Sequence, residues 1–423
     1  MPFSGFAFFL RPFPYTLFLL PFTTDWTVWL VPVAQGLVAA YAVRRALSAA
    51  GLALRPAPFL AVILALALLT SLPVQAGMIM PDLFTGPLIL MAYAVYTGWA
   101  ERSRTGRLFD VAVLAGMTMV HLSHLAILGA LAALMLLWSL VRRRGLRAVL
   151  LGLCAPLLLA AGTLMAANAV LMKHPVLSPS SPLFLLARLI GDGPARDYLA
   201  EACPERGYLL CGKLDTLDRS APGFITSDYF LWHPDGARHA FGDTPRFLAE
   251  ASEINRATIA SRPLDVARHM AINAATLLVS PQIDIILTNP VKPWTRQFFS
   301  RFGQPVYTAF MTSLQMAQAF PRAALNAVQL TVLVLSLLAL GWVLATRAGR
   351  LGGRQGGLLA VLALGLMLNA AVAGGLSAVH PRYQNRVAWL LPLAAIAALL
   401  AVQPRRTEEP AASPALASGR PAA

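Results

Sequence analysis

Charged residues are scarce in this chain. It also lacks the sequence pattern of an outer-membrane β-barrel and the internal repeat of many transporters. Only 13% of the 423 residues are charged, whereas 57% are hydrophobic. The alternating ten-residue segments of an outer-membrane barrel are absent, and the lack of an internal repeat argues against transporter folds built from inverted repeats. Apolar runs of 17 to 25 residues are present instead, and such runs can cross about 30 Å of hydrocarbon. The sequence therefore predicts an all-α polytopic membrane protein.

Nine apolar runs are predicted to cross the membrane, at about residues 26–43, 58–76, 83–99, 108–121, 124–141, 148–171, 323–346, 357–377 and 387–402. His121 and His124 interrupt one long run, and arginines flank both of its ends. Two crossings are therefore favoured there over one long bent helix. Residues 1–25 are apolar but broken by prolines, and they lack the basic start of a signal peptide. This segment is predicted to be a partial or interfacial helix.

Residues 173–322 have the composition of a soluble segment. Thr244 followed by Pro245 predicts a capped helix start. A second helix, from Arg262 to about Ser280, becomes steadily more apolar, so its far end is expected in the membrane interface. Aromatic residues between 291 and 320 predict a helix on the membrane surface. The predicted organisation is an N-terminal segment (1–25), membrane helices one to six (26–172), an α-rich extracytoplasmic segment with membrane-surface helices (173–322), membrane helices seven to nine (323–402) and a disordered cytoplasmic tail (403–423).

The net charge of +15 indicates membrane topology and not nucleic-acid binding. Thirteen of the nineteen acidic residues lie between His174 and Arg322, where fourteen Lys and Arg nearly balance them. Most of the surplus lies in short turns between apolar runs, which is the pattern of cytoplasmic turns. The basic turns are 44–56, 100–107, 142–147 and 347–355. This orientation places the turns 77–82, 121–124 and 378–386 and the segment 173–322 on the outer side.

The three cysteines are too few for a disulfide framework. Cys154 falls inside an apolar run, where it is expected to pack as a small apolar residue. Cys203 and Cys211 lie eight residues apart in the predicted extracytoplasmic segment. They are either a local disulfide or two buried thiols, and their spacing does not suit a zinc site.

One outer turn carries charges that the positive-inside pattern does not explain. It reads Val379-His380-Pro381-Arg382-Tyr383-Gln384-Asn385-Arg386 and lies between two long apolar runs. Arg382 and Arg386 are four residues apart, on one face if the turn begins a helix, and an arginine fork suits phosphate. The alternatives are pairing with acids of the extracytoplasmic segment or contact with lipid headgroups. We expect His380, Gln384, Arg382 and Arg386 to bind a phosphate or pyrophosphate group.

Asp82, His121 and His124 are the other polar residues expected at this face. Asp82 follows Pro81 at the start of an apolar run. It is either an N-cap or a carboxylate that acts as a general base or holds a divalent cation. His121 and His124 are three residues apart, which puts them one turn apart in a helix. Two histidines alone are a weak metal signal, so hydrogen bonding at a helix end or contact with substrate or phosphate is expected.

These features together resemble the GT-C superfamily of membrane glycosyltransferases. The resemblance rests on the many helices, the Pro81-Asp82 turn, a short helix pair and the basic turn before the last span. The segments 184–195 and 228–235 also resemble an uncharacterised group of bacterial multi-pass proteins. The superfamily usually carries an acidic motif in a long outer loop after its first helix, and no such helix and loop precede residue 10. The resemblance thus implies that an N-terminal part is missing or that the chain lacks that carboxylate.

The resemblance implies a function and a location. A hexosyl or pentosyl group would move from a polyprenyl-phosphate donor to an acceptor outside the bacterial inner membrane. Asp82 would act as the catalytic residue, and Arg382 and Arg386 would stabilise the leaving phosphate. The cofactor is either none or a divalent cation. The alternative function is a non-catalytic carrier or flippase for lipid-linked sugars, or an envelope assembly protein.

Overall fold

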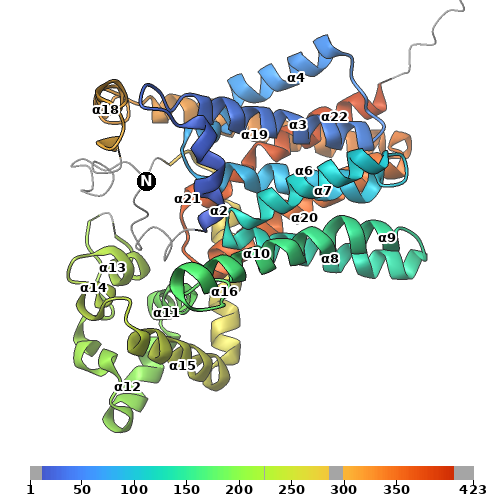
Figure 1. Ribbon diagram of the computed structural model, residues 1–423. Helices are drawn as coiled ribbons and strands as arrows, with labels where there is room; N and C mark the ends of the chain where they lie inside the picture. The colour runs from blue at the N-terminus through green and yellow to red at the C-terminus, as the bar shows by residue number, and fades with distance from the viewer. Residues whose placement is uncertain (1–11, 223, 285–298, 404–423) are drawn as a thin grey trace, which may run out of the picture.

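The computed structural model of the protein describes residues 12–222, 224–284 and 299–403, and its regular structure is helical (Figure 1). Five helical stretches in the described ranges are long and apolar enough to cross a membrane. An all-helical protein with several candidate spans is therefore confirmed. The five stretches are α8 (Leu122–Arg142), α9 (Leu146–Val149) continuing through a π-helical turn into α10 (Ala155–Met172), α19 (Arg322–Thr346), α20 (Gly353–Leu376), and α21 (Pro381–Ala388) continuing into α22 (Leu390–Val402).

The four other predicted spans correspond to helices that are shorter or less apolar. They are α3 (Leu30–Ala49), α4 (Pro56–Leu69), α6 (Thr85–Gly98) and α7 (Arg104–Met119). The last three have 14, 14 and 16 residues, or about 21–24 Å at 1.5 Å per residue. Short elements connect or precede them: α2 (Phe13–Leu19), η1 (Leu20–Phe22), α5 (Leu72–Gly77) and η2 (Pro81–Phe84).

Helix α6 lies at the centre of the bundle. Every residue from Thr85 to Val95 is buried, and α3, α7, α8 and α20 pack around the helix. Its start is in close contact with the last span, because a Cβ atom at Gly86 would lie 2.5 Å from the indole ring of Trp389. Trp389 is itself fully buried, and its Nε1 donates to the carbonyl of Arg386 at 3.0 Å. Glycine at position 86 thus lets α6 approach the start of α22.

The break between α7 and α8 lies where the histidines predicted it. Helix α7 ends at Met119 and α8 begins at Leu122, with His121 in an extended conformation between them. The His121 Nδ1 accepts a hydrogen bond from the backbone N–H of Ser123 at 3.1 Å and so caps α8. The run is therefore two helices and not one bent helix.

Residues 181–278 form a group of helices with a hydrophobic core of its own, at one end of the bundle (Figure 1). Thr244 accepts a hydrogen bond from the N–H of Phe247, so the predicted N-cap is confirmed. Cys203 and Cys211 form a disulfide in this group, with their Cα atoms 5.3 Å apart. Burial raises the pKa of the nearby Tyr208, and its hydrogen bonds with Tyr198 and Glu253 raise it further. The helices are α11 (Ser181–Asp192), α12 (Pro194–Arg206), η4 (Leu209–Thr216), α13 (Thr226–Trp232), α14 (Ala237–Phe241), α15 (Pro245–Ser261) and α16 (Pro263–Leu278).

Helix α16 joins this group to the membrane helices. The apolar end of this helix was predicted to lie in the membrane interface. In the structure, α16 packs along α20. The two backbones approach closely, since a Cβ atom at Gly374 would lie 2.7 Å from the carbonyl oxygen of Asn273. Part of the aromatic stretch at 291–320 lies outside the described residues, and α18 (Gln304–Met311) is the helix described there.

Candidate functional site

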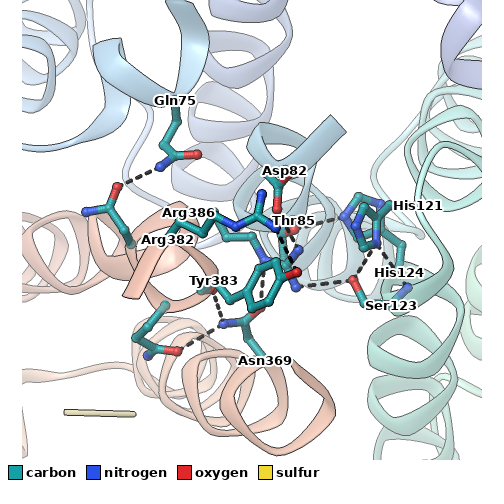
Figure 2. A network of polar contacts seen from close by, with 12 residues as sticks. Gln75, Asp82, Thr85, His121, Ser123, His124, Asn369, Arg382, Tyr383 and Arg386 are labelled. Atoms are coloured by element: carbon teal, nitrogen blue, oxygen red, sulfur yellow. Dashed lines mark hydrogen bonds and ion pairs between the residues drawn. The ribbon is translucent and has the colours of Figure 1, made fainter. Parts of the chain in front are cut away.

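The site is built around the start of the last candidate span, where α21 meets η2, α8 and α20. Arg386 projects from α21 into the bundle, and its side chain is 1% exposed. Its Nη1 donates to Asp82 Oδ1 at 3.0 Å, Nε donates to Asn369 Oδ1 at 3.0 Å, and Nη2 donates to Ser123 Oγ at 3.2 Å (Figure 2). One guanidinium thus links four separate elements.

Asp82 supplies the negative charge that keeps Arg386 inside the bundle. Its side chain is 5% exposed and lies in the 3-10 turn η2 that precedes α6. The rigid ring of Pro81 and the start of α6 hold the carboxylate at this position. A buried arginine without such a partner would be strongly destabilising, because the desolvation cost of the charge would be uncompensated. The pair joins positions 304 residues apart in the sequence.

A histidine–serine branch extends the network to α7 and α8. The Ser123 Oγ is 2.8 Å from His121 Nδ1 and also accepts from Arg386. His124 is fully buried; its Nε2 is 2.8 Å from Thr85 Oγ1 and its Nδ1 is 2.6 Å from the carbonyl of Met117. Both ring nitrogens of His124 are thus occupied within the protein. His124 therefore serves as a bridge between α8 and α6, and the half-buried His121 lies beside it, with the ring centroids 5.2 Å apart (Figure 2).

An amide branch extends the network in the opposite direction. Asn369 accepts from Arg386 and donates to the Tyr383 carbonyl at 2.7 Å and to Gln384 Oε1 at 3.0 Å. Asn385 accepts from Gln75 Nε2 at 2.6 Å and donates to the Pro281 carbonyl at 2.8 Å. The buried side chains of Asn369 and Asn385 each donate and accept, and these bonds fix the orientation of α21 within the bundle.

Arg382 lies one turn before Arg386 and has a different environment. It is half-buried, its guanidinium lies 4.5 Å from the ring centroid of Tyr383, and its Nη2 donates to the Tyr383 hydroxyl at 2.9 Å. No carboxylate oxygen of the described residues lies within 4.0 Å of its nitrogens. A guanidinium carries five N–H donors. Arg382 therefore keeps N–H donors at the edge of the network, and the carboxylates of Asp82 and Asp228 attract its charge without direct contact.

His380 contacts Asp228 across the boundary between the candidate membrane helices and the helices of residues 181–278, which we call the polar segment. Its Nε2 lies 3.0 Å from Asp228 Oδ2, and the two side chains are 25% and 15% exposed. Asp228 belongs to α13, so this contact docks α13 beside the start of α21. The His380 ring also meets the Tyr383 ring edge-on, with centroids 5.7 Å apart.

The structure thus gathers most of the sequence-predicted site residues around α21 and leaves the cysteines elsewhere. The network includes or borders Asp82, His121, His124, His380, Arg382, Gln384 and Arg386. The Cys203–Cys211 disulfide packs instead against the hydrophobic core of the polar segment. Among the residues that the structure describes, no group of three or more His, Cys, Asp or Glu could hold a metal ion.

Sequence reasoning missed the amides that complete the network. Gln75 and Asn369 are single polar residues inside otherwise apolar stretches, and both are buried. Polar residues within membrane helices are costly unless they are satisfied. Their position alone was thus a signal that each has a buried partner, although it could not identify that partner.

Comparisons with protein-family models, with curated proteins and with solved structures found no match. The class that the fold and the site define is therefore an all-helical protein with five candidate membrane spans and a buried ionic network at the start of the last one.

Proposed function

We propose that this chain is a membrane glycosyltransferase that takes a sugar from a polyprenyl-phosphate donor, with the donor phosphate bound at Arg382. The observation that carries the proposal is the contrast between the two arginines of α21. Arg386 is paired with Asp82, and each of its guanidinium nitrogens donates to a side chain. Arg382, one turn away, retains N–H donors at a half-buried position and has no carboxylate of the described residues within 4.0 Å. A half-buried guanidinium with spare donors is suited to bind phosphate.

The proposal includes the nine-span topology. Helices α3, α4, α6 and α7 would also cross the membrane, since bundle packing accommodates short and tilted helices. The basic turns after α3, α6, α8 and α19 would then all face the cytoplasm. The start of α21 and the helices α11–α16 would lie outside, which is where a polyprenyl-phosphate-sugar is used by the superfamily that the sequence resembles.

His380 and Asp228 are the groups best placed to activate the acceptor. The Nε2 of His380 lies 3.0 Å from Asp228 Oδ2, and a neutral imidazole protonated on that nitrogen would present a lone pair on Nδ1. Nδ1 would take the proton of the acceptor hydroxyl while its oxygen attacks the anomeric carbon. The bond between the anomeric carbon and the phosphate oxygen breaks, and the phosphate leaves with the electron pair. Arg382 stabilises that charge, and Asp82 acts indirectly by holding Arg386 and thereby α21.

The first prediction concerns Arg382. Proteoliposomes containing the purified chain would receive a polyprenyl-phospho-sugar and an acceptor extract, and sugar transfer would be measured. Arg382→Ala should lower turnover about 100-fold, the usual effect of removing a preorganised donor from a developing oxyanion. Arg256→Ala is the matched control, because Arg256 is exposed on α15. Unchanged turnover in Arg382→Ala at normal protein yield would remove this arginine from the site.

The alternative is a carrier or assembly protein that binds the lipid phosphate without transferring sugar. One observation favours it: Asp82, the carboxylate that the resemblance assigns to catalysis, is engaged by Arg386. The same proteoliposomes separate the two functions. Binding of the radiolabelled lipid that depends on Arg382, with no transfer in any variant including His380→Ala, would establish the carrier.

A further inference from the structure

A second ionic cluster lies at the end of the bundle opposite α21, where α3 ends and α7 begins (Figure 1). Its centre is Asp110 on α7, whose side chain is 3% exposed. Arg45 Nη2 donates to Asp110 Oδ2 at 2.9 Å, and Arg102 Nε donates to the same oxygen at 3.1 Å. The hydroxyl of Tyr41 donates to Asp110 Oδ1. The carboxylate of Asp110 thus accepts hydrogen bonds from two arginines and one tyrosine.

A third arginine, Arg107, lies beside Asp110 and its partners, and it forms no ion pair with a carboxylate of the described residues. Arg107 is half-buried, with its guanidinium 5.2 Å from the ring centroid of Trp99 and its Nη2 3.4 Å from the carbonyl of Ala100. Its Nε is buried and has no hydrogen-bond partner among the described residues. A buried donor without a partner loses its hydrogen bonds to water and gains none in return. The Nε–H of Arg107 is therefore a buried donor that no acceptor of the described residues satisfies.

The charges around this point do not balance. Arg45, Arg102, Arg107 and Asp110 line a shallow surface hollow together with apolar residues of α6. Three guanidinium groups face one carboxylate, which leaves two positive charges in a partly buried place. Arg102 is held over the α7 backbone, since a Cβ atom at Gly106 would lie 2.5 Å from its Nε. The arginines are thus positioned by packing around a shared hollow.

We propose that this hollow binds a phosphate-bearing anion, and that the anion is the headgroup of an acidic phospholipid. Arginine forks match phosphate oxygens, and a bound phosphate would supply both the missing charge and an acceptor for the Nε of Arg107. The lipid source follows from the neighbouring surface. Leu108 and Phe109, directly after Arg107, are 71% and 55% exposed. Such side chains contact acyl chains, so the hollow lies at headgroup level beside them.

The test measures lipid retention by native mass spectrometry of the full chain in detergent. The probes are phosphatidylglycerol, phosphatidylcholine and inorganic phosphate. Phosphatidylglycerol should be retained in preference to phosphatidylcholine, and Arg107→Gln should weaken its apparent affinity about tenfold, as expected for one lost charge-assisted hydrogen bond. Arg104→Gln is the matched control, because it removes the same charge from an exposed position of the same helix that does not line the hollow.

Each possible result either supports or contradicts the binding of an acidic phospholipid at this hollow. Inorganic phosphate that binds with the same dependence on Arg107 and displaces the lipid would retain the phosphate site but make its ligand a soluble ion. Equal losses in Arg104→Gln and Arg107→Gln, or no preference for phosphatidylglycerol and no binding of inorganic phosphate, would overturn it. If Arg107→Gln does not fold, Arg107→Lys replaces it. That variant keeps the charge but loses the fork, and it should still bind more weakly than Arg104→Gln.

Discussion

Arg386 has a fully buried guanidinium, and each of its nitrogens donates to a different side chain. Arg382, with the same chemistry four residues earlier, is half-buried and contacts Tyr383. The difference lies in what surrounds each side chain and not in the residue type. At the residue scale, therefore, the site consists of one arginine whose side chain is engaged within the bundle and a second arginine that keeps N–H donors at the edge of the network.

The Asp82–Arg386 pair should dominate stability at this scale. Asp82→Ala leaves Arg386 buried without its counter-charge and should lower the free energy of unfolding by about 3–5 kcal/mol. The double variant with Arg386→Met added should recover most of that loss, because neither charge is then buried. The midpoint of thermal unfolding in detergent measures both. Asp215→Ala is the control, since its pair with Arg219 is exposed and should contribute under about 1 kcal/mol. A double variant no more stable than Asp82→Ala would contradict this account.

At the scale of the secondary-structure elements, two helix–helix contacts require glycine because the helices approach closely. These contacts position the helices together with the burial of apolar side chains. Gly86 on α6 faces Trp389, and Gly374 on α20 faces the backbone of α16. The first contact brings the turn that carries Asp82 next to the helix that carries Arg386. The second brings the polar segment against the membrane helices. The site therefore depends on helix packing outside the network itself.

Two alanine substitutions should have opposite effects on stability. Gly86→Ala introduces a Cβ atom 2.5 Å from the buried ring of Trp389, and such overpacking should lower stability by about 1–3 kcal/mol. Gly116→Ala on α7 meets no atom within 4 Å and should raise stability by about 0.4–1 kcal/mol, because alanine restricts the unfolded chain. Thermal unfolding of the two variants side by side checks the signs. A stabilising Gly86→Ala would mean that α6 and α22 are not in close contact.

At the scale of the whole molecule, the number of membrane-crossing helices determines whether the basic turn before α7 and the polar segment lie on the same side of the membrane. If nine helices cross, three spans separate the turn before α7 from the end of α15, and the two positions lie on opposite sides. If only the five long stretches cross, two spans separate them, and both lie on one side.

A labelling experiment distinguishes these topologies. Thr105→Cys and Ser261→Cys, each exposed and each made in a Cys154→Ala background, would be treated with a membrane-impermeant maleimide in intact cells. The nine-span topology predicts labelling at 261 in intact cells and at 105 only after permeabilisation. Labelling of both positions under the same condition would favour five spans and place the basic turn before α7 on the same side as the polar segment.

The amino-acid sequence by itself determined the features that depend on local composition. The helical class and the break at His121 followed from apolar runs and from residues that interrupt them, and the start of α15 followed from Thr244 and Pro245. Such features need only neighbours in the chain, because hydrophobicity, capping and proline geometry act over a few residues.

Only the tertiary structure decided which polar residues are partners. Asp82 and Arg386 are 304 positions apart, and Asn369 completes the pair from a third helix. Asp82 and Asn369 are isolated polar residues beside or within apolar runs, and Arg386 belongs to a polar turn. The sequence of these positions carries no record of the partner across the bundle. The reason is physical: a buried charge or amide needs some partner, and helix packing alone determines which one comes within 3 Å. That packing also separated the two arginines of α21, leaving Arg382 as the one whose donors remain at the edge of the site.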